Sequence, residues 1–335
     1  MNILYTTDDK FVGKVGASIC SVFDNNKSME QISVYIIGQD ISKENRRKLK
    51  ELSQIYGRSI EIIELENLKN YFDFEFDTSG WNQIVLARLL LDKLLPDYIE
   101  RIIYLDGDTI NISNLQSLWE TDLNGKVLGA CIEATVDQKR KIDLEMDGIP
   151  YINAGVLLFD LKRWKEEHCF DRIMEYYRRR GGRLFANDQD VINAVLKESI
   201  YYLPPKYNFY NIYWFYPYSV LKKLMGKAVY YEKEIFTDSL DNPAIIHYLG
   251  EERPWRKGNH HKFKKHFQLY HSKTPWKDEA MEEGWGAYFL CWDIFNKILH
   301  PFPMLRYRII NVLIPWFMIW RKKQLNKEKR QAKNE

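Results

Sequence analysis

The sequence predicts an α/β fold in which helices cover both faces of a single, mostly parallel sheet. Short apolar, β-prone runs alternate with runs of helical periodicity from residue 3 to residue 196. The composition, 45% hydrophobic and 28% charged among 335 residues, is typical of a globular chain. Acidic residues directly follow two of the apolar runs, and ligands gather at such strand ends in open α/β sheets.

The predicted elements follow one another in a regular order. Strands are expected at residues 3–6, 32–37, 60–63, 101–105, 128–132 and 156–159. Helices are expected at residues 12–25, after the N-cap residue Ser42, at 83–95 before Pro96, at 170–179, and after Asp188, which could be a second N-cap. Residues 201–218 are rich in aromatic side chains without periodicity, and we expect a packed loop that lines a cleft.

The motif Asp106-Gly107-Asp108 follows the apolar run 102–105 at the expected end of a central strand. Two carboxylates one residue apart at a turn can face one ion, and Gly107 lets the backbone bend and approach a ligand closely. Carboxylate oxygens suit Mg²⁺ or Mn²⁺, commonly shared with a substrate diphosphate. A plain turn explains the motif alone equally well, because Asp and Gly are common in turns. A solvated turn is likewise an alternative for Asp8 and Asp9 after the first strand.

Several function classes are excluded by composition and motifs. The net charge of +3 gives no case for nucleic-acid binding. The four cysteines have no CxxC spacing, so we expect reduced thiols without a disulfide framework or zinc site. The chain has neither a G-x-G-x-x-G after its first strand nor a Walker A loop. A phosphate ligand would therefore depend on a metal at Asp106 and Asp108.

Three later segments add polar groups to this prediction. Asn153-Ala154-Gly155 stands just ahead of the strand 156–159, where two small residues indicate close approach of a backbone or ligand. The run 187–190, NDQD, holds more polar groups than a helix cap requires. His247 follows the apolar residues 244–246 and is a candidate third metal ligand, although a lone histidine is more often structural.

Together these segments resemble glycosyltransferase family 8, which includes bacterial lipooligosaccharide galactosyltransferases, related glucosyltransferases and glycogenin. The similar elements occur in the family's order from residue 1 to about residue 260. They are the first strand with Thr6, Asp8 and Phe11, the segment 85–90 with Arg88, YLDGD at 104–108, INAGVLLFDLKRW at 152–164, NDQD at 187–190 and HYLGEERPW at 247–255. The resemblance implies a single Rossmann-like, GT-A-type domain that binds a nucleotide sugar.

The resemblance also implies roles for individual residues. It assigns a Mn²⁺ ion, with Mg²⁺ as an alternative, to Asp106, Asp108 and His247, where it would bridge the diphosphate of a UDP-hexose. It places Asp8, Phe11 and the backbone near Thr6 at the uracil, and Gly250 and Arg253 at the diphosphate. It places Arg88, Asn153, Asp188 and Gln189 around the donor sugar. Close relatives have Tyr, Lys and Asp where this chain has Phe11, Arg253 and Glu133, so the choice between galactose and glucose stays open.

The expected activity is metal-dependent, retaining transfer of galactose or glucose from a UDP-sugar to a saccharide or lipid-linked saccharide in bacterial cell-surface synthesis. Gln189 matches the family's candidate nucleophile, yet an amide is a weak nucleophile, and Asp188 is chemically better suited. We favour a front-face route in which the leaving phosphate oxygen accepts the acceptor proton. Alternatives are a catalytically inactive nucleotide-sugar-binding subunit and, less well supported, a DxD-type phosphatase, whose motif normally lies on the first strand.

The C-terminal residues resemble the family less. We divide the chain into a catalytic domain at 1–270 and a helical, basic and aromatic extension at 271–335. Basic residues flank the apolar run 305–320, which is too short to span a bilayer. This pattern is typical of a helix lying on an anionic membrane surface, so we expect a cytoplasmic protein peripheral to the inner face of the membrane. A core helix followed by a solvated tail is the alternative.

Overall fold

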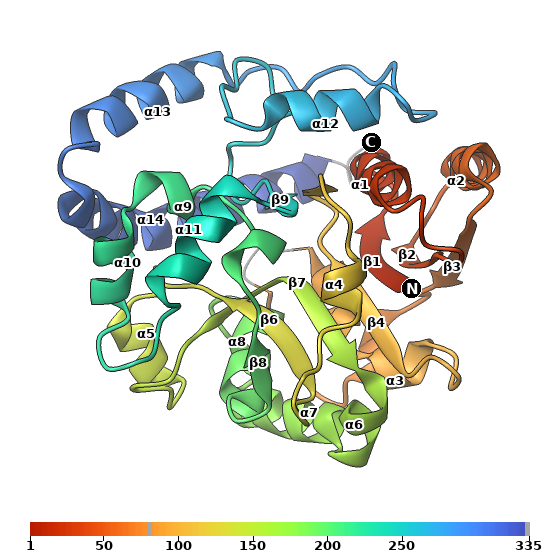
Figure 1. Ribbon diagram of the computed structural model, residues 1–335, viewed down its shortest axis with the longest axis horizontal. Coiled ribbons are helices and arrows are strands. Elements are labelled where there is room, and N and C mark those ends of the chain that lie inside the picture. The colour runs from red at the N-terminus through yellow and green to blue at the C-terminus, as the bar shows by residue number, and fades with distance from the viewer. Residues whose placement is uncertain (79–81, 332–335) are drawn as a thin grey trace.

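The computed structural model describes residues 1–78 and 82–331 and has a seven-stranded mixed sheet at its centre (Figure 1). The strand order is β3-β2-β1-β4-β7-β6-β8. The strands are β1 (Asn2–Asp8), β2 (Ser33–Gln39), β3 (Ser59–Glu64), β4 (Arg101–Leu105), β6 (Leu128–Ile132), β7 (Ile152–Asp160) and β8 (Ile200–Tyr202). Only β7 runs antiparallel to its neighbours β4 and β6. The predicted mostly parallel α/β sheet is therefore confirmed.

Helices connect the strands and continue beyond the sheet. The longer helices before residue 200 are α1 (Val12–Asn25), α2 (Lys43–Tyr56), α7 (Cys169–Arg179) and α8 (Asn187–Leu196). Shorter segments are η1 (Leu68–Tyr71), η2 (Gln83–Leu89), α3 (Leu91–Leu94), α4 (Gln116–Trp119), α5 (Gln138–Asp143), α6 (Leu161–Glu166) and η3 (Pro205–Tyr207). The helices that follow are α9 (Ile212–Phe215), α10 (Tyr218–Leu224), α11 (Lys233–Asp241), α12 (Lys264–His271), α13 (Gly286–Leu299) and α14 (Pro303–Gln331).

Each face of the sheet buries its own hydrophobic core, because alternate strand residues point to opposite sides. On β4, Ile103 and Leu105 lie in one core with α1 and α2, and Ile102 and Tyr104 lie in the other with η2, α7 and α8. This doubly wound arrangement leaves the carboxyl ends of β1 and β4 side by side at one edge, as the register pairs Ile3 with Ile103. Ligands bind at this edge in open α/β sheets.

A second, two-stranded sheet extends the same edge. It pairs β5 (Thr109–Asn111) with β9 (Ile245–His247) in antiparallel register, and Thr109 lies opposite His247. β5 begins at the residue after Asp108. The pairing therefore brings His247, which lies more than a hundred residues later in the sequence, close to the end of β4. The predicted third ligand is thus positioned by backbone hydrogen bonds.

The predicted helix over residues 83–95 is wrong in detail. The chain forms the 3₁₀ helix η2 and the single turn α3 instead. Almost every side chain from Ile84 to Leu91 is buried, including that of Arg88. An amphipathic α-helix would leave one face in solvent. This segment instead packs against the sheet and against α8, so few of its side chains reach solvent. The backbone conformation is therefore decided by packing.

Three other expectations need correction. The aromatic segment 201–218 is not one loop but contains β8, η3 and α9, and its backbone pairs with β9 at a Phe209–Ile246 bridge. The small residues Asn153-Ala154-Gly155 lie inside β7 rather than ahead of it. Asp188 is not the N-cap of α8, because Ala186 holds that position and Asp188 lies in the first turn.

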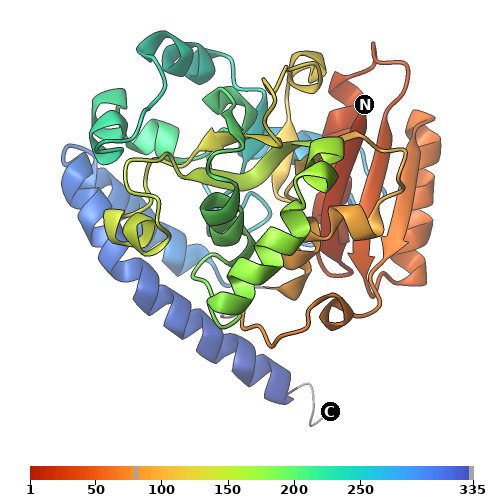
Figure 2. The same cartoon turned by 90° about the horizontal axis from the view of Figure 1, so that it is seen from below.

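The C-terminal region is helical, as predicted, and its last helix runs along the edge of the molecule with its far end projecting outward (Figure 2). The predicted domain boundary after residue 270 falls inside α12. Beyond it, Trp276 is buried against α1, where it would touch any Cβ added to Gly16. Among the residues that the structure describes, no helix is both long enough and apolar enough to cross a membrane.

Candidate functional site

The Asp106-Gly107-Asp108 turn is held from both sides. The Asp106 N–H donates to the carbonyl of Gly155 on β7 at 2.8 Å, and the Thr109 hydroxyl donates to the Asp106 carbonyl at 2.8 Å. A Cβ on Gly107 would lie 2.6 Å from the side chain of Val15 in α1. Glycine is therefore required here because a helix packs closely on the turn.

His247 completes a group of three metal-ligating side chains. Its Nε2 lies 3.3 Å from Asp108 Oδ1 and 3.8 Å from Asp106 Oδ2, and one ligand atom from each residue falls within 4.8 Å of the others. The side chain is 1% exposed, and within the described chain its Nε2 has no hydrogen-bond partner. A buried polar atom without a partner costs free energy unless something binds it. Two carboxylates and one imidazole nitrogen form a donor set that fits Mn²⁺ or Mg²⁺.

Gly155 on β7 makes room for the histidine ring. A Cβ at this position would lie 2.3 Å from His247 Cε1 and 2.7 Å from its Nδ1. The close approach predicted from the small residues is therefore real, and the group that approaches is the imidazole of His247.

Arg88 is a buried cation beside the carboxylates. Its guanidinium donates to Asp106 Oδ1 at 2.8 Å and to the Ala154 carbonyl at 2.6 Å, and its Nε lies 3.0 Å from Asp188 Oδ2. It also lies 4.2 Å from the ring centroid of Tyr104, whose hydroxyl donates to Asp106 at 2.7 Å. Asp106 thus keeps its Oδ2 directed toward His247 while Oδ1 is held by Arg88 and Tyr104.

Burial and neighbouring charges shift the pKa values of three groups in the site. Burial raises the pKa of Asp188 to about 6, and the neighbouring Arg88 offsets only part of this effect. For Asp108, burial also acts to raise the pKa, but His247 and Arg253 outweigh it and the pKa is lowered. Burial opposes the charged form of His247, yet the two aspartates raise its pKa. Mn²⁺ bound there would displace that proton.

The NDQD segment forms the first turn of α8 and faces β7. The Gln189 Oε1 accepts a hydrogen bond from the Ala154 N–H at 3.0 Å, and its Nε2 donates to the Tyr151 hydroxyl at 3.2 Å. Asp190 has a structural role, since it accepts from Arg140, Tyr151 and the Ala186 N–H. Asp188 and Gln189 therefore point toward the site, and Asp190 anchors the turn that carries them.

The end of β1 contributes a second group of polar side chains. Asp8 accepts hydrogen bonds from the Phe11 N–H at 3.1 Å and from Asn82 Nδ2 at 2.6 Å. The Thr6 hydroxyl lies 3.1 Å from that of Tyr104, which in turn bonds to Asp106. The first strand is therefore connected to the carboxylate cluster through Tyr104.

The loop after β9 closes over the other side of the cluster. Gly250 has a φ of +82°, a conformation that favours glycine. Its carbonyl accepts from Arg253 Nε at 3.0 Å, and Arg253 Nη2 lies 3.3 Å from Asp108 Oδ2. The Arg253 guanidinium also lies 5.6 Å from the Phe11 ring and 5.5 Å from the Trp255 ring. Phe11, Arg253 and Asp108 thus form a continuous surface.

Every predicted site residue is brought to this one edge, and three residues that the sequence analysis overlooked join them: Tyr104, Tyr151 and Asn208. Tyr104 was identifiable, because residues two apart on a strand share a face and Asp106 follows it by two. The sequence holds no local signal for Asn208, which reaches His247 only through the bridge between Phe209 and β9.

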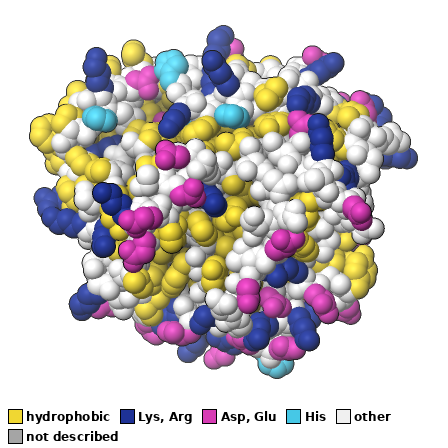
Figure 3. Space-filling model, viewed as in Figure 1, with side chains coloured by type: hydrophobic (Ala, Val, Ile, Leu, Met, Phe, Trp, Pro, Cys, Tyr) yellow, Lys and Arg dark blue, Asp and Glu magenta, His cyan; other side chains and the backbone are white. Residues whose placement is uncertain are grey.

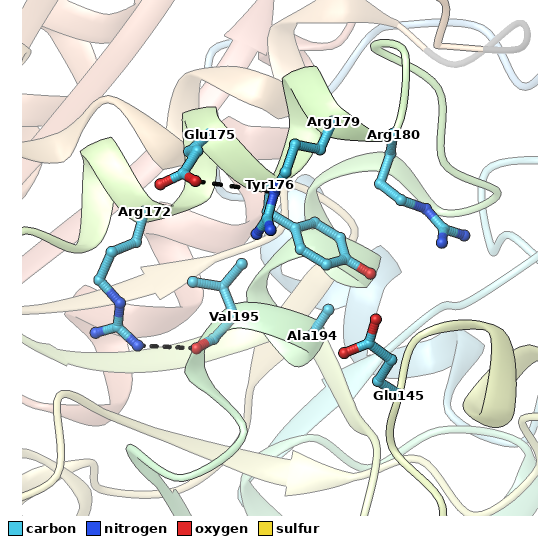
Figure 4. Close-up of a pocket in the computed structure, with 8 residues that line it drawn as sticks. All are labelled: Glu145, Arg172, Glu175, Tyr176, Arg179, Arg180, Ala194 and Val195. Carbon is cyan, nitrogen blue, oxygen red and sulfur yellow. Dashed lines mark hydrogen bonds and ion pairs between the residues drawn. The ribbon is translucent and has the colours of Figure 1, made fainter.

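A cavity of about 360 Å³ lies apart from this site, between α7 and α8 (Figure 4). Charged side chains line it, and several already have partners within the protein. Arg172 donates to the Val195 carbonyl at 3.0 Å, and Arg179 pairs with Glu175 at 3.9 Å. We assign no function to this cavity.

The mostly parallel central sheet with helices on both faces is a fold of the GT-A type. A solved structure of the galactosyltransferase LgtC, in complex with donor and acceptor sugar analogs, superposes with a TM-score of 0.68 at 24% identity, covering 82% of this chain and 96% of that one. The glycosyl transferase family 8 model matches residues 2–258. The chain belongs to this family.

Curated relatives agree with this assignment. The lipopolysaccharide 1,2-glucosyltransferase of Escherichia coli K12 is 26% identical over 284 residues, which cover 84% of this chain and 80% of that protein. General stress protein A of Bacillus subtilis 168 is 24% identical over 279 residues, 82% of this chain and 94% of that protein. The family predicted from the sequence is confirmed, and the chain is a glycosyltransferase.

Proposed function

We propose that this enzyme transfers galactose or glucose from a UDP-sugar to a saccharide acceptor during synthesis of a bacterial cell-surface polysaccharide or glycolipid. The observation that carries this proposal is the cluster of Asp106, Asp108 and His247, in which the buried Nε2 of the imidazole faces the two carboxylates and has no hydrogen-bond partner among the described residues. The cluster lies beside the carboxyl ends of β1 and β4, the edge at which open α/β sheets bind ligands. Relatives named as lipopolysaccharide glucosyl- and galactosyltransferases support the choice of these two sugars.

The cluster fits Mn²⁺ as the cofactor, with Mg²⁺ as the alternative. When bound, a divalent ion would offset the negative charge of the diphosphate leaving group. Arg253 lies 3.3 Å from Asp108 and stands over the same edge, so its guanidinium can pair with a phosphate oxygen. Gly250 lets its loop turn sharply at this point.

The remaining residues divide between the two ends of the donor. Asp8, Phe11 and the backbone near Thr6 form the proposed uracil site, at the end of β1. Arg88, Asn153, Asp188 and Gln189 form the proposed sugar site, between β7 and α8. Glu133 lies at the back of that site and accepts from Tyr210 at 2.6 Å. A longer acid than Asp there changes which sugar hydroxyls can be reached.

We further propose retention of the donor's configuration by a front-face route. In this route the bond from the sugar to the diphosphate breaks as the acceptor oxygen attacks the same face, and the leaving phosphate oxygen takes the acceptor proton. Both polar atoms of the Gln189 side chain already have partners, in the Ala154 N–H and the Tyr151 hydroxyl. Because these hydrogen bonds hold the amide, we propose that Gln189 positions the substrate and does not act as a nucleophile. Asp188 would bind sugar hydroxyls.

The C-terminal extension, residues 271–335, is proposed to hold the enzyme at the cytoplasmic face of the membrane, where a lipid-linked acceptor would be met. Large apolar side chains stand exposed along α13 and α14, among them Leu290, Ile298, Val312 and Trp316, the last of which is 71% exposed. Figure 3 shows hydrophobic side chains at the surface over the end of the molecule where α13 lies. The side chains of Phe317, Trp320, Arg321 and Lys322, which the sequence prediction also uses, lie outside the described residues.

Release of UDP from a panel of UDP-sugars with Mn²⁺, with and without saccharide acceptors, tests the proposal. We expect turnover with UDP-galactose or UDP-glucose and an α-linked product in the NMR spectrum. A protein that binds UDP-hexose but releases no UDP under any condition would instead be an inactive binding subunit. A β-linked product would contradict the retaining assignment.

A further inference from the structure

The nitrogen of His247 that does not face the carboxylates is held by an asparagine. His247 Nδ1 lies 2.9 Å from Asn208 Oδ1. The amide of Asn208 then reaches Asn153, with its Nδ2 2.8 Å from Asn153 Oδ1. The Asn153 Nδ2 lies 3.4 Å from a carboxylate oxygen of Glu133. A chain of side chains therefore runs from the imidazole, through two amides, to a buried acid.

The donor and the acceptor of each hydrogen bond in this series can be assigned by starting from Asn153. Asn153 Oδ1 accepts a hydrogen bond from the backbone N–H of Gly155 at 2.9 Å, and a backbone N–H can only donate. The other polar atom of this amide, which faces Glu133, must therefore be the NH₂. Asn208 must therefore donate to Asn153 through its NH₂ and present its oxygen to His247. His247 must in turn carry a proton on Nδ1.

We propose that Asn208 is a positioning residue that fixes His247 as the Nδ1–H tautomer, which leaves the Nε2 lone pair free to bind the divalent cation that Asp106 and Asp108 would hold with it. The inference rests on the proposed metal site. It explains why Nε2 is buried without a partner in the described chain while Nδ1 has one. Histidine ligands of metals commonly have their other nitrogen held in this way.

The surroundings make the arrangement rigid. Asn208 is fully buried, and the His247 N–H donates to the carbonyl of the adjacent Phe209 at 2.9 Å. Gly155 lies against the ring from the other side, where any side chain would collide with it. At the far end, Tyr210 donates to Glu133 at 2.6 Å. Neither the ring nor the amide can turn without breaking buried hydrogen bonds.

The test compares three variants by direct binding of Mn²⁺, measured by electron paramagnetic resonance of the free ion. Asn208→Leu keeps the branched shape of the side chain, with somewhat greater volume, but removes the acceptor, and we expect Mn²⁺ affinity to fall roughly 10- to 100-fold. Asn208→Asp loses the hydrogen bond to Asn153 Oδ1 but still offers an oxygen to Nδ1–H, so it should retain more of the affinity than Asn208→Leu does. Asn193→Leu is the matched control, since Asn193 is an equally buried amide that bonds to the backbone of Ile152 and does not contact His247. It should lower stability without weakening Mn²⁺ binding.

A second readout does not need the metal. Long-range ¹H–¹⁵N spectra of the metal-free protein at alkaline pH, assigned with a His247→Gln variant, report which ring nitrogen is protonated. We expect Nδ1–H for His247 in the wild type and in Asn208→Asp, and mixed tautomers in Asn208→Leu. The inference is overturned if the wild type shows Nε2–H, or if Asn208→Leu binds Mn²⁺ as tightly as Asn193→Leu does. Absence of Mn²⁺ binding by the wild type would overturn the proposed metal site instead.

Discussion

At the scale of single residues, Asp188 shows how burial sets the charge of the site. Its pKa is raised from an ordinary 3.8 to about 6, chiefly by burial. The folded protein therefore binds this proton more tightly than the unfolded chain does. As pH rises from about 4 through 6, the stabilising contribution of the protonated form is lost, and above 6 the ionised carboxylate pairs with Arg88.

This shift predicts a pH dependence of kcat/KM, which reports groups in the free enzyme. If ionised Asp188 binds sugar hydroxyls, kcat/KM should rise with pH along a limb centred near 6. Asp188→Asn should lose at least roughly tenfold in turnover, and that limb should disappear. A pH profile that stays unchanged in Asp188→Asn would show that the limb belongs to another group.

Gly155→Ala tests whether close packing of β7 against the imidazole holds His247 in position. The added methyl group would lie within 2.3 Å of the imidazole, so the ring must move away from Asp108. We expect Mn²⁺ affinity, measured by calorimetric titration, to fall roughly 10-fold or more, as it does when the support of a ligand is lost. Gly286→Ala is the control, because nothing lies within 4 Å of its Cβ position. Equal affinities in the two variants would contradict the proposed packing constraint.

The proposed ligand residues were predictable because each carries a chemical signal in its own segment. Asp106 and Asp108 follow the apolar strand β4, and His247 is the last residue of the apolar strand β9. Asn208 was not predictable, because its role depends on which amide of the aromatic segment lies beside β9. That pairing is decided by the Phe209–Ile246 bridge, which local sequence does not encode.

At the scale of elements, the amphipathic helices and apolar strands were predictable, and the fully buried connections were not. In α2, Ser42 caps the helix through a 3.2 Å bond from the Asn45 N–H, as its sequence position indicated. In η2, by contrast, Arg88 turns inward to Asp106, Asp188 and the Ala154 carbonyl. Tertiary contacts there override the local helical preference.

The loop from Gly250 to Gly258 is braced by the segment that leads into α13. Arg256 pairs with Glu251 of the same loop and donates to Glu282 at 2.9 Å. Its guanidinium lies 3.6 Å from the ring centroid of Trp285, at the N-cap of α13. The loop that carries Arg253 is therefore attached to residues beyond the predicted domain boundary.

Arg256→Ala should loosen this attachment and raise the KM for the UDP-sugar more than it lowers kcat. This cation–π contact is only partly buried, so it is worth about 0.5–2 kcal/mol, much of which would be lost. Lys257→Ala is the matched control, because its pair with Glu283 is about two-thirds exposed on both sides and is worth about 0–1 kcal/mol. If steady-state kinetics give the same KM for both variants, the segment that leads into α13 does not support the loop that carries Arg253.

At the scale of the whole molecule, the proposed membrane contact is separable from the donor site. Arg306 is buried and donates to the Tyr216 hydroxyl at 2.7 Å, so a truncation must keep it. Deleting residues 312–335 removes only the outer part of α14. We expect the truncated protein to release UDP at the wild-type rate but to lose flotation with anionic liposomes.

The basic residues should contribute about 1 kcal/mol each near an anionic surface, and this contribution should weaken with added salt. Flotation at low and high ionic strength measures it, with neutral liposomes as the control. Full-length protein that stays unbound to anionic liposomes at low salt would contradict the membrane proposal, and the helix would then be a packing element alone.

The central claim is that Asp106, Asp108 and His247 bind one divalent cation needed for transfer. The most direct measurement is the rate of UDP release from the preferred UDP-hexose as Mn²⁺ is titrated, for the wild type and for Asp106→Asn, Asp108→Asn and His247→Ala, with folding checked by circular dichroism. We predict saturable activation of the wild type, none in EDTA, and loss of activity in each folded variant. Full activity in EDTA, or in either aspartate variant, would contradict the claim.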